Sequence, residues 1–297
     1  MKNGEEGKIK FLYIMGENPM ISDPDLNHVK KALEKIDFVV VQDIFLSETA
    51  QLADVVLPAA CFAEKDGTFT NTERRVQRVR KAINLVGKAK PDWEILMLVM
   101  NKLGYNKVYK NPSEIMDEIN SVTPSYGGIT YDRIDEDGLQ WPCLDKNHSG
   151  TKYLHKDKFV RGLGLFQPHD YIESAELPDD NYPYILTTGR ILYHYHTRTM
   201  TSRVEGLNKL YPKSYIEINP IDADNLSVND GDRVKVSSRR GEVVTTVKVE
   251  NIIEKGVVFM PFHFSDGAAN YLTNSAVDPI AKIPEFKVCA VNIEKSI

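Results

Sequence analysis

The sequence has few cysteines, and their spacing excludes the sites that cysteines usually build. Three occur among 297 residues, at Cys61, Cys143 and Cys289, and none forms a C-x-x-C pair or stands at metal-ligand spacing with a histidine. The pattern predicts neither an iron–sulfur cluster nor a zinc site in this chain. A sparse and odd cysteine count also argues against a disulfide framework and favours a reducing, cytoplasmic compartment.

Long apolar runs and a charge excess are missing as well. Apolar runs such as residues 38–41 are far shorter than the roughly 20 residues that a membrane-spanning helix requires. The first six residues are polar and lack the apolar core of a signal peptide. The 42 acidic and 37 basic residues give a net charge of −5 and are mixed along the chain. We therefore expect no membrane segment and no nucleic-acid partner.

The first hundred residues alternate short apolar runs with helical periodicity, which is typical of a parallel sheet wrapped by helices. Strands are predicted at residues 10–15, 38–42 and 55–57. Asp23-Pro24 is predicted to begin the first helix, Ser47 to cap a second, and Asp92 to start a third. Residues 1–103 are thus predicted to form an α/β, Rossmann-like domain.

Two further regions follow. Residues 104–183 lose the periodicity and are rich in Pro, Gly, Asp and Lys, so we expect an irregular connecting segment. From residue 184 to 297 the pattern changes to short alternating strands separated by Gly or Asp turns, which predicts a small closed barrel. The expected strands are residues 184–188, 215–219, 233–237, 242–250, 257–260 and 288–293.

Candidate ligand-binding residues follow the predicted strands of the first domain, because open parallel sheets bind ligands outside the carboxyl ends of their strands. Gly16 and Asn18 follow one strand, Gln42 and Asp43 stand at the end of another, and Lys65 lies in the loop after the third. These residue types suit a nucleotide, since a carboxylate accepts two hydrogen bonds from a guanine edge and a lysine neutralises a phosphate. Spacing alone leaves open a simpler interpretation, in which Asp43 only caps the following turn.

Other motifs carry less information. Gly162-Leu163-Gly164 lacks the third glycine and the strand–helix context of a dinucleotide fingerprint. His194 and His196 are spaced to chelate a metal, but no third ligand stands nearby, so no metal site is predicted. No set of catalytic residues can be assigned from the sequence.

Several segments in this order resemble the molybdopterin oxidoreductases, and within them the carboxyl-terminal half of the formate dehydrogenase catalytic (alpha) subunit. The resemblance covers nearly the whole chain. The segments that carry it are residues 13–19 (YIMGENP), 41–50 (VQDIFLSETA), 53–58 (ADVVLP), 64–77 (EKDGTFTNTERRVQ), 140–143 (QWPC), 188–197 (TGRILYHYHT), Asn270, 281–282 (AK) and 286–291 (FKVCAV).

The resemblance implies a fold, a cofactor and a set of site residues. The fold would be part of a parallel-sheet cofactor domain followed by a six-stranded, double-psi-type β-barrel. The cofactor would be a pair of molybdopterin guanine dinucleotides (bis-MGD) holding molybdenum or tungsten. The residues matching its guanine contacts are Gly16, Asn18, Gln42, Asp43, Lys65 and Asp92. Those matching its pterin and pyrophosphate contacts are Thr188, Gly189, Arg190, Ile191, Leu192, His194, Tyr195, His196, Thr197, Phe262, Asn270 and Lys287.

The chemistry of these residues agrees with such a ligand. A polyanionic cofactor needs cationic donors such as Arg190, Lys65 and Lys287, and a flat pterin needs aromatic walls such as Phe262. One position departs from the family pattern: Arg198 stands where the family usually has glycine, which places contacts beyond Thr197 in doubt.

The resemblance also implies partners. The family's four-cysteine cluster domain, its selenocysteine or cysteine metal ligand, the adjacent histidine and a later arginine have no counterpart in this sequence. We therefore expect a fragment, a split-gene subunit or a degenerate paralogue. As an oxidoreductase it would interconvert formate and CO2 only together with an N-terminal catalytic half that carries an iron–sulfur cluster, and with electron-transfer subunits. A nitrate reductase-type member and a non-catalytic cofactor-binding or scaffold protein remain the alternatives.

Overall fold

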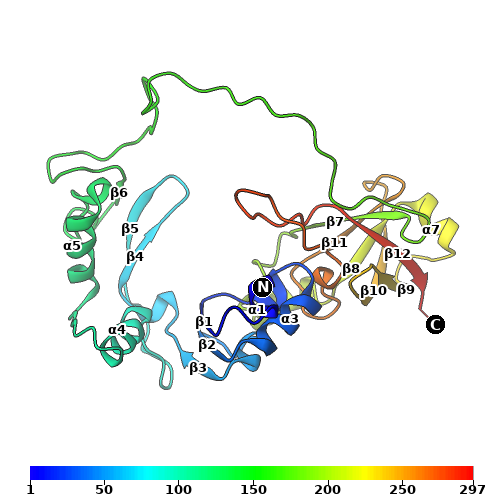
Figure 1. Cartoon of the computed structure of the whole chain (residues 1–297), viewed down its shortest axis with the longest axis horizontal. Coiled ribbons are helices and arrows are strands. Elements are labelled where there is room, and N and C mark those ends of the chain that lie inside the picture. Colours follow the sequence, from blue (N-terminus) through cyan, green and yellow to red (C-terminus); the bar gives the residue numbers. More distant parts are fainter. Residues whose placement is uncertain (297) are drawn as a thin grey trace. The chain divides into compact units, whose positions relative to one another are not determined.

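A computed structural model describes residues 1–296 (Figure 1). The chain forms two compact units. The first unit comprises residues 1–41, 45–56 and 171 onward, and the second comprises residues 42–44 and 57–170.

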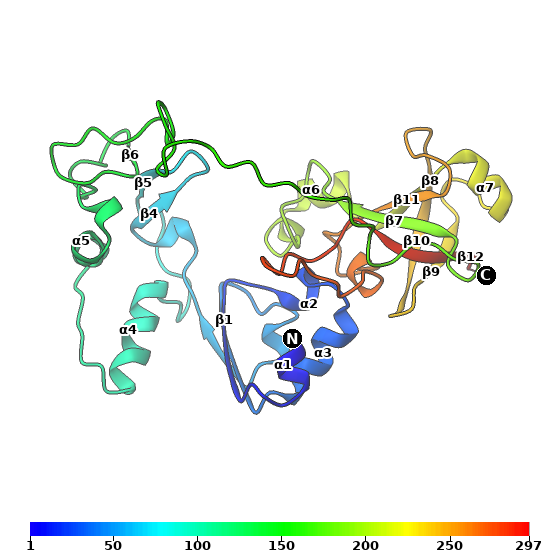
Figure 2. The same cartoon turned by 45° about the horizontal axis from the view of Figure 1, so that its top comes forward.

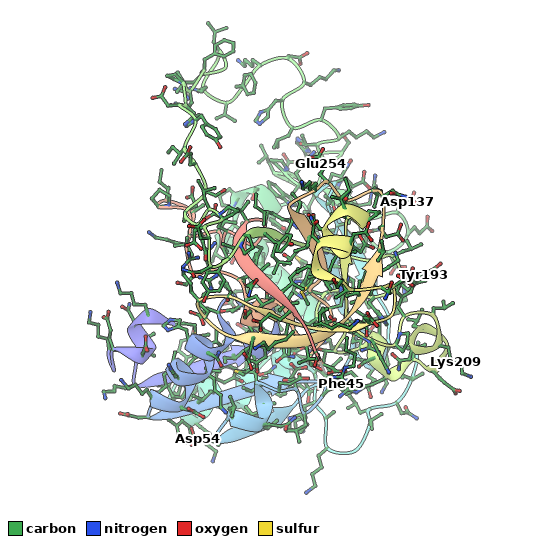
Figure 3. The ribbon with its side chains drawn as sticks, turned by 90° about the vertical axis from the view of Figure 1, so that its right-hand side faces the viewer. Phe45, Asp54, Asp137, Tyr193, Lys209 and Glu254 are labelled. Carbon is green, nitrogen blue, oxygen red and sulfur yellow. The ribbon has the colours of Figure 1, made fainter. Side chains whose placement is uncertain are left out.

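The first unit begins with a small α/β layer. Its elements are α1 (Lys2–Glu5), β1 (Phe11–Met15), α2 (Pro19–Ser22), α3 (Leu26–Lys35), β2 (Phe38–Asp43), a 3-10 helix (Ala50–Leu52) and β3 (Val55–Pro58). The last two residues of β2 and of β3 are counted in the second unit. The strands form a three-stranded sheet in the order β1-β2-β3, and the connections between them pass through helical turns, as parallel strands require. Asp54, labelled in Figure 3, accepts from the Val39 amide at 2.7 Å and so joins the start of β3 to β2.

Helix α3 covers one face of this sheet (Figure 2). The apolar stripe predicted for this helix is confirmed, because Val29 and Leu33 pack with Ile14, Val39 and Val41 in one core.

The amino-terminal cap of α3 is Asp25, whose carboxylate accepts from the His28 amide at 3.2 Å. The prediction of Asp23-Pro24 as cap and first residue is wrong, because residues 19–22 form the extra turn α2 and Asp23 ends it. Ser47 accepts from the Ala50 amide at 3.3 Å, but the turn it precedes is a 3-10 helix of three residues and not an α-helix.

The remainder of the first unit is a closed barrel of six strands in the order β10-β8-β11-β7-β12-β9. The strands are β7 (Tyr184–Gly189), β8 (Tyr215–Ile218), β9 (Arg233–Ser237), β10 (Glu242–Val249), β11 (Val257–Pro261) and β12 (Cys289–Lys295). Each contains most of a predicted strand, so the barrel prediction is confirmed. The pairs β10·β8 and β11·β7 are parallel and the other four are antiparallel.

The barrel is filled by inward-facing β-branched and aliphatic side chains. On β9 and β10 the buried residues alternate with exposed or half-buried ones, which is the period of two that a strand with one buried face requires. Short helical elements lie between the strands: α6 (Glu205–Leu210), α7 (Pro220–Leu226), and 3-10 helices at Thr201–Arg203 and Ala269–Tyr271. Two side-chain amides join the barrel to the α/β layer, since Asn27 donates to the Arg240 carbonyl at 2.9 Å and Asn270 to the Ile21 carbonyl at 2.8 Å.

The second unit has its own sheet and core. Its elements are a 3-10 helix (Phe62–Glu64), β4 (Gly67–Thr70), β5 (Arg75–Val79), α4 (Asp92–Lys102), α5 (Pro112–Val122), a 3-10 helix (Pro124–Tyr126) and β6 (Leu139–Gln140). Strands β4, β5 and β6 pair antiparallel in that order. The buried core of the unit consists of Val76, Met116, Ile129, Ile134 and Cys143.

This core corrects the prediction for residues 104–183. The first part of that range contributes α5, β6 and four of the five buried core residues, so it is folded and not merely connecting. The composition misled because Pro112 and Asn111 mark the start of a helix: Asn111 caps it by accepting from the Glu114 amide at 3.2 Å. Among the described residues, every helix is too short or too polar to span a bilayer.

Candidate functional site

Three of the predicted guanine-binding residues meet at one carboxylate in the second unit. The amide of Gln42 donates to Oδ1 of Asp92 at 2.7 Å, and the ammonium of Lys65 pairs with Oδ2 of the same side chain. Gln42 is fully buried, so its amide needs a protein partner. Asp92 is the first residue of α4, where the positive end of the helix dipole favours a carboxylate. The structure thus assembles a polar cluster from residues 42, 65 and 92.

Asp43 follows Gln42 directly at the end of β2. Its Oδ1 accepts from the Ile44 amide at 2.6 Å, and its main-chain carbonyl accepts from the Ala59 amide at 2.9 Å. The first contact is a local turn contact of the kind that the simpler interpretation of Asp43 requires. Its role in guanine recognition stays a prediction.

Asn18 does not belong to the cluster at Asp92. Its side chain makes hydrogen bonds to other residues of the first unit. It is buried, its amide donates to Glu48 Oε2 at 2.8 Å, and its oxygen accepts from the Thr49 hydroxyl at 2.7 Å. These bonds hold the segment after β2 against the turn after β1. Gly16, two residues earlier, is exposed with φ +63°, a conformation that favours glycine.

The predicted pterin segment, residues 188–197, runs from the end of β7 into an irregular turn. Thr188 is buried and donates to the Phe286 carbonyl at 2.8 Å, while Lys287 donates to the Thr188 carbonyl. Gly189 lies so close to Phe259 that an added Cβ would approach its ring to 2.7 Å. A larger residue here would displace the Phe259 ring at the point where the chain leaves the barrel.

Aromatic rings gather beside this turn. Phe262 lies 4.7 Å from His263 and 5.7 Å from His196 between ring centroids, and the exposed Arg190 guanidinium lies 5.6 Å from the centre of the Phe262 ring. Leu192 and Tyr195 are exposed, as is the neighbouring Tyr193 (Figure 3). The structure thus brings Arg190, His196 and Phe262 together as an aromatic and cationic surface.

His263, which the sequence analysis did not identify, is hydrogen-bonded to the main chain of this turn. The Ile191 amide donates to its Nε2 at 2.9 Å, so Nε2 is unprotonated and Nδ1 carries the hydrogen that is donated to the His196 carbonyl. Burial lowers the pKa of His263 from its ordinary value of 6.5. A neutral His263 therefore fixes the main chain of the predicted pterin segment at Ile191 and at His196.

Two predicted residues are engaged in structural bonds. Both ring nitrogens of His194 have protein partners, Thr201 Oγ1 at 3.1 Å and the Tyr211 carbonyl at 2.8 Å. Asn270 is buried and bonds the Ile21 carbonyl, as described above. Ligand contacts by His194 and Asn270 stay predictions. To contact a ligand, each side chain would have to give up one of its present hydrogen bonds.

Arg198 keeps the backbone that glycine favours. Its φ is +62°, in the left-handed region, although a side chain is present. The guanidinium donates to Asn208 Oδ1 at 2.6 Å and lies 4.7 Å from the centre of the Phe264 ring. These contacts offset the local strain, so the path of the chain beyond Thr197 does not require glycine here.

A polar cavity of about 180 Å³ lies within the first unit, next to Thr197. Residues from the segment after β2 and from the barrel turns line it: Leu46, Ser47, Glu48, Gln51, Thr197, Arg198, Thr199, Ser202, Arg203, His263 and Ser265. Its hydroxyl and guanidinium groups can bind an anion, and the one carboxylate in the lining, that of Glu48, accepts from Asn18. The position of residues 46–48 after a buried strand is a sequence signal for part of this lining. Arg203 and His263 carry no such signal.

Comparison with known proteins gives consistent matches. The family described as "Molybdopterin oxidoreductase" matches residues 1–102, and the family described as "Molydopterin dinucleotide binding domain" matches residues 184–290. The chain is 60% identical over 296 residues to the F420-dependent formate dehydrogenase subunit alpha of Methanocaldococcus jannaschii. This match covers 98% of this chain and 44% of the relative. It is 38% identical over 294 residues to formate dehydrogenase H of Escherichia coli, covering 97% of this chain and 41% of that protein.

The fold is also found among solved structures. Acetylene hydratase from Pelobacter acetylenicus superimposes with a TM-score of 0.76 at 17% identity, over 97% of this chain and 44% of that one. The chain therefore spans less than half the length of the proteins it matches.

Proposed function

Because this chain belongs to the molybdopterin oxidoreductase family, we propose that it is the cofactor-binding, carboxyl-terminal portion of a formate dehydrogenase catalytic subunit. Its ligand would be bis-MGD with molybdenum or tungsten. The names of the relatives at 60% and 38% identity support formate as the substrate class. Together with polypeptide that corresponds to the rest of those relatives, the chain would interconvert formate and CO2, and alone it would be inactive.

The cluster at Asp92 is the observation that carries the nucleotide part of the proposal. Gln42, Lys65 and Asp92 were selected from separate segments as guanine contacts, and they meet in one hydrogen-bonded network. Lys65 would neutralise phosphate, and the carboxylate of Asp43 would accept from the guanine edge. The Asp92 carboxylate would keep Lys65 and Gln42 in place before the ligand binds.

The turn after β7 would bind the pterin end of the ligand. Arg190 and Phe262 provide a guanidinium over an aromatic ring. The main-chain amides of Ile191 and Tyr195 already donate to His263 and Thr201, so further donors would come from the other amides of this turn. The cavity next to Thr197 has the donor types that a pyrophosphate needs. The bound group would supply the two-electron redox chemistry, whereas the residues of this chain would bind and orient it.

The partners and compartment are part of the same proposal. An N-terminal catalytic half with an iron–sulfur cluster and electron-transfer subunits are proposed because the relatives are alpha subunits of formate dehydrogenases. A reducing, cytoplasmic compartment is proposed because all three cysteines are free thiols.

Replacing Asp43 with alanine tests the nucleotide part. The variant loses the charged acceptor of two guanine hydrogen bonds, and each lost bond costs about 1.5 to 3 kcal/mol of binding free energy. The cofactor content of the assembled enzyme should therefore fall roughly tenfold or more. The measurement is the guanine nucleotide and pterin released per protein, with circular dichroism as the test of folding.

Asp37→Ala is the matched control. Asp37 precedes the other end of the same strand, is largely exposed and pairs with Lys10 at 3.3 Å. This variant should retain full cofactor content. If folded Asp43→Ala keeps its full cofactor content, Asp43 only caps the turn and does not bind guanine.

A further inference from the structure

The turn after β7, residues 190–197, is joined at two points to a single side chain. The Ile191 amide donates to Nε2 of His263, and Nδ1 of the same ring donates to the His196 carbonyl. The ring is completely buried, directly after the end of β11. One imidazole therefore sets the distance between two main-chain groups that lie five positions apart in the turn.

The backbone of His196 needs such a restraint. Its φ is +43°, in the left-handed region that residues with a side chain rarely adopt. A conformation of this kind persists only where the surrounding structure holds it. The hydrogen bond from His263 holds the His196 carbonyl, and with it the ring that lies 5.7 Å from Phe262.

The bond to Ile191 exists only while His263 is neutral. An amide N–H can donate but not accept, so Nε2 has to be unprotonated. A proton at Nε2 would set two donors against each other in a buried site, and a buried donor without an acceptor costs free energy. Burial lowers the pKa of His263, because it disfavours the charged ring.

The two neighbouring histidines differ from His263 in this respect. His194 donates from Nε2 to the Tyr211 carbonyl, and its Nδ1 is paired with the Thr201 hydroxyl. A hydroxyl can donate or accept, so protonation of His194 leaves both bonds intact. The His196 side chain is exposed, so water solvates its charge.

The other charged groups around the ring favour its neutral form. Arg190 on the turn acts in the same direction as burial on the pKa of His263, because like charges repel. The cavity that His263 lines also contains Arg198, Arg203 and Glu48. Its carboxylate, that of Glu48, is already bonded by Asn18, and Asp266 interacts with Arg198.

We propose that His263 is a pH-sensitive positioning residue for the cofactor. In its neutral form it holds residues 190–197 in the conformation that binds the pterin end of the ligand. Protonation at Nε2 breaks the bond to Ile191, opens the turn and releases the ligand. The inference rests on the proposed function, because that function assigns the pterin to this turn.

The first test follows the turn in the full chain without ligand. Hydrogen exchange of the Ile191 amide is measured by NMR between about pH 5 and pH 8, the range in which histidines titrate, and is corrected for the intrinsic rate. Spectra of ¹⁵N-labelled histidine in the same samples report the protonation of His263. As Nε2 is protonated, the corrected exchange should become roughly tenfold faster or more, because the buried amide loses its acceptor.

Two variants separate the hydrogen bonds from the charge. His263→Gln keeps a donor and an acceptor but does not titrate, so exchange at Ile191 should stay slow at every pH. His263→Leu has neither group, so exchange should be fast at every pH. His148→Gln is the matched control, because Nδ1 of His148 also accepts from a main-chain amide, that of Gly150 at 3.1 Å, but in the second unit. This control should keep the wild-type pH profile.

Three outcomes would overturn the inference. The first is a wild type whose exchange at Ile191 does not change although the spectra show His263 to be protonated. The second is a His263 that stays neutral over the whole pH range. The third is a folded His263→Gln variant that keeps the wild-type pH dependence. The third decides the question even if His263→Leu does not fold.

The proposed function is scored separately, on the enzyme assembled with polypeptide that corresponds to the rest of the relatives. Bound pterin and guanine nucleotide are measured after incubation at the same pH values. The wild type should lose them as the turn opens, and His263→Gln should retain them. If the wild type contains neither at any pH, the proposed function is wrong. If it keeps both while the turn opens, the inference alone is wrong.

Discussion

The barrel and the three-stranded sheet are both built from short apolar strands, but they bury them to different degrees. Each barrel strand has two neighbours, and the side chains that point inward, such as Ile216 and Val234, are completely buried. The sheet has two edge strands, and Phe11 on β1 and Phe38 on β2 remain about half exposed. Because the barrel is closed, about a hundred residues are enough to pair every strand edge and to bury the inward-facing apolar side chains.

The largest expected effect is therefore in the barrel core. Ile216 is 0% exposed and belongs to the main core cluster. Ile216→Ala should lower the free energy of unfolding by about 2 to 5 kcal/mol, because it leaves a cavity in a closed structure that relaxes little. Urea unfolding followed by circular dichroism measures it. Ile252→Ala, at an exposed barrel position, is the control and should change the value by less than about 0.5 kcal/mol.

A smaller effect is expected from pH, again on the barrel side. His263 accepts a hydrogen bond at Nε2 while neutral, and burial lowers its pKa from 6.5. The unfolded chain therefore binds more protons than the folded chain between these two pKa values. Stability should be fully present above about pH 6.5 and fall as the pH decreases through the lowered pKa.

His263→Gln sharpens this prediction, because a glutamine amide can donate and accept as the neutral ring does but does not titrate. Between neutral pH and the lowered pKa, the stability of the variant should decrease less than that of the wild type. Thermal unfolding at a series of pH values measures this difference. A wild type and a variant with the same pH profile would show that His263 does not titrate on unfolding.

The smallest effect is expected at Phe11, on strand β1 of the open sheet. Phe11 is 56% exposed, and its principal contact there is the stacked ring of Phe38. Phe11→Ala should lower the free energy of unfolding by no more than about 1 kcal/mol, the contribution of such a pair. The same urea experiment measures it. A loss as large as that of Ile216→Ala would contradict the comparison, since the sheet would then be as complete as the barrel.

The barrel is the part of the fold that the sequence predicts best. Its strands alternate buried and exposed residues with a period of two, and glycine or aspartate turns separate them, so local pattern is sufficient to locate them. The start of α3 was mistaken because two acidic residues, Asp23 and Asp25, both satisfy the rule for a cap. The choice between them depends on whether residues 19–22 form a turn, which local pattern does not decide.

The candidate site was predictable in its residue types but not in its contacts. Gln42 and Asp92 lie 50 positions apart and form a direct hydrogen bond. Asn270 was selected as a ligand contact, yet it bonds the Ile21 carbonyl 249 positions away. A polar side chain at a strand end serves a ligand or the fold depending on such distant partners, and pattern carries no information about them.

Strand β12 occupies the gap between β7 and β9 in the barrel, and this position has a consequence for synthesis. Strand β7 pairs only with strands more than sixty residues later in the sequence, β11 and β12. The nascent barrel therefore keeps unpaired edges on β7 and β9 until residues 289–295 have left the ribosome. Pairing over such separations is slow, and open edges invite aggregation, so translation exposes this region to chaperones for longer than its finished, closed form would indicate.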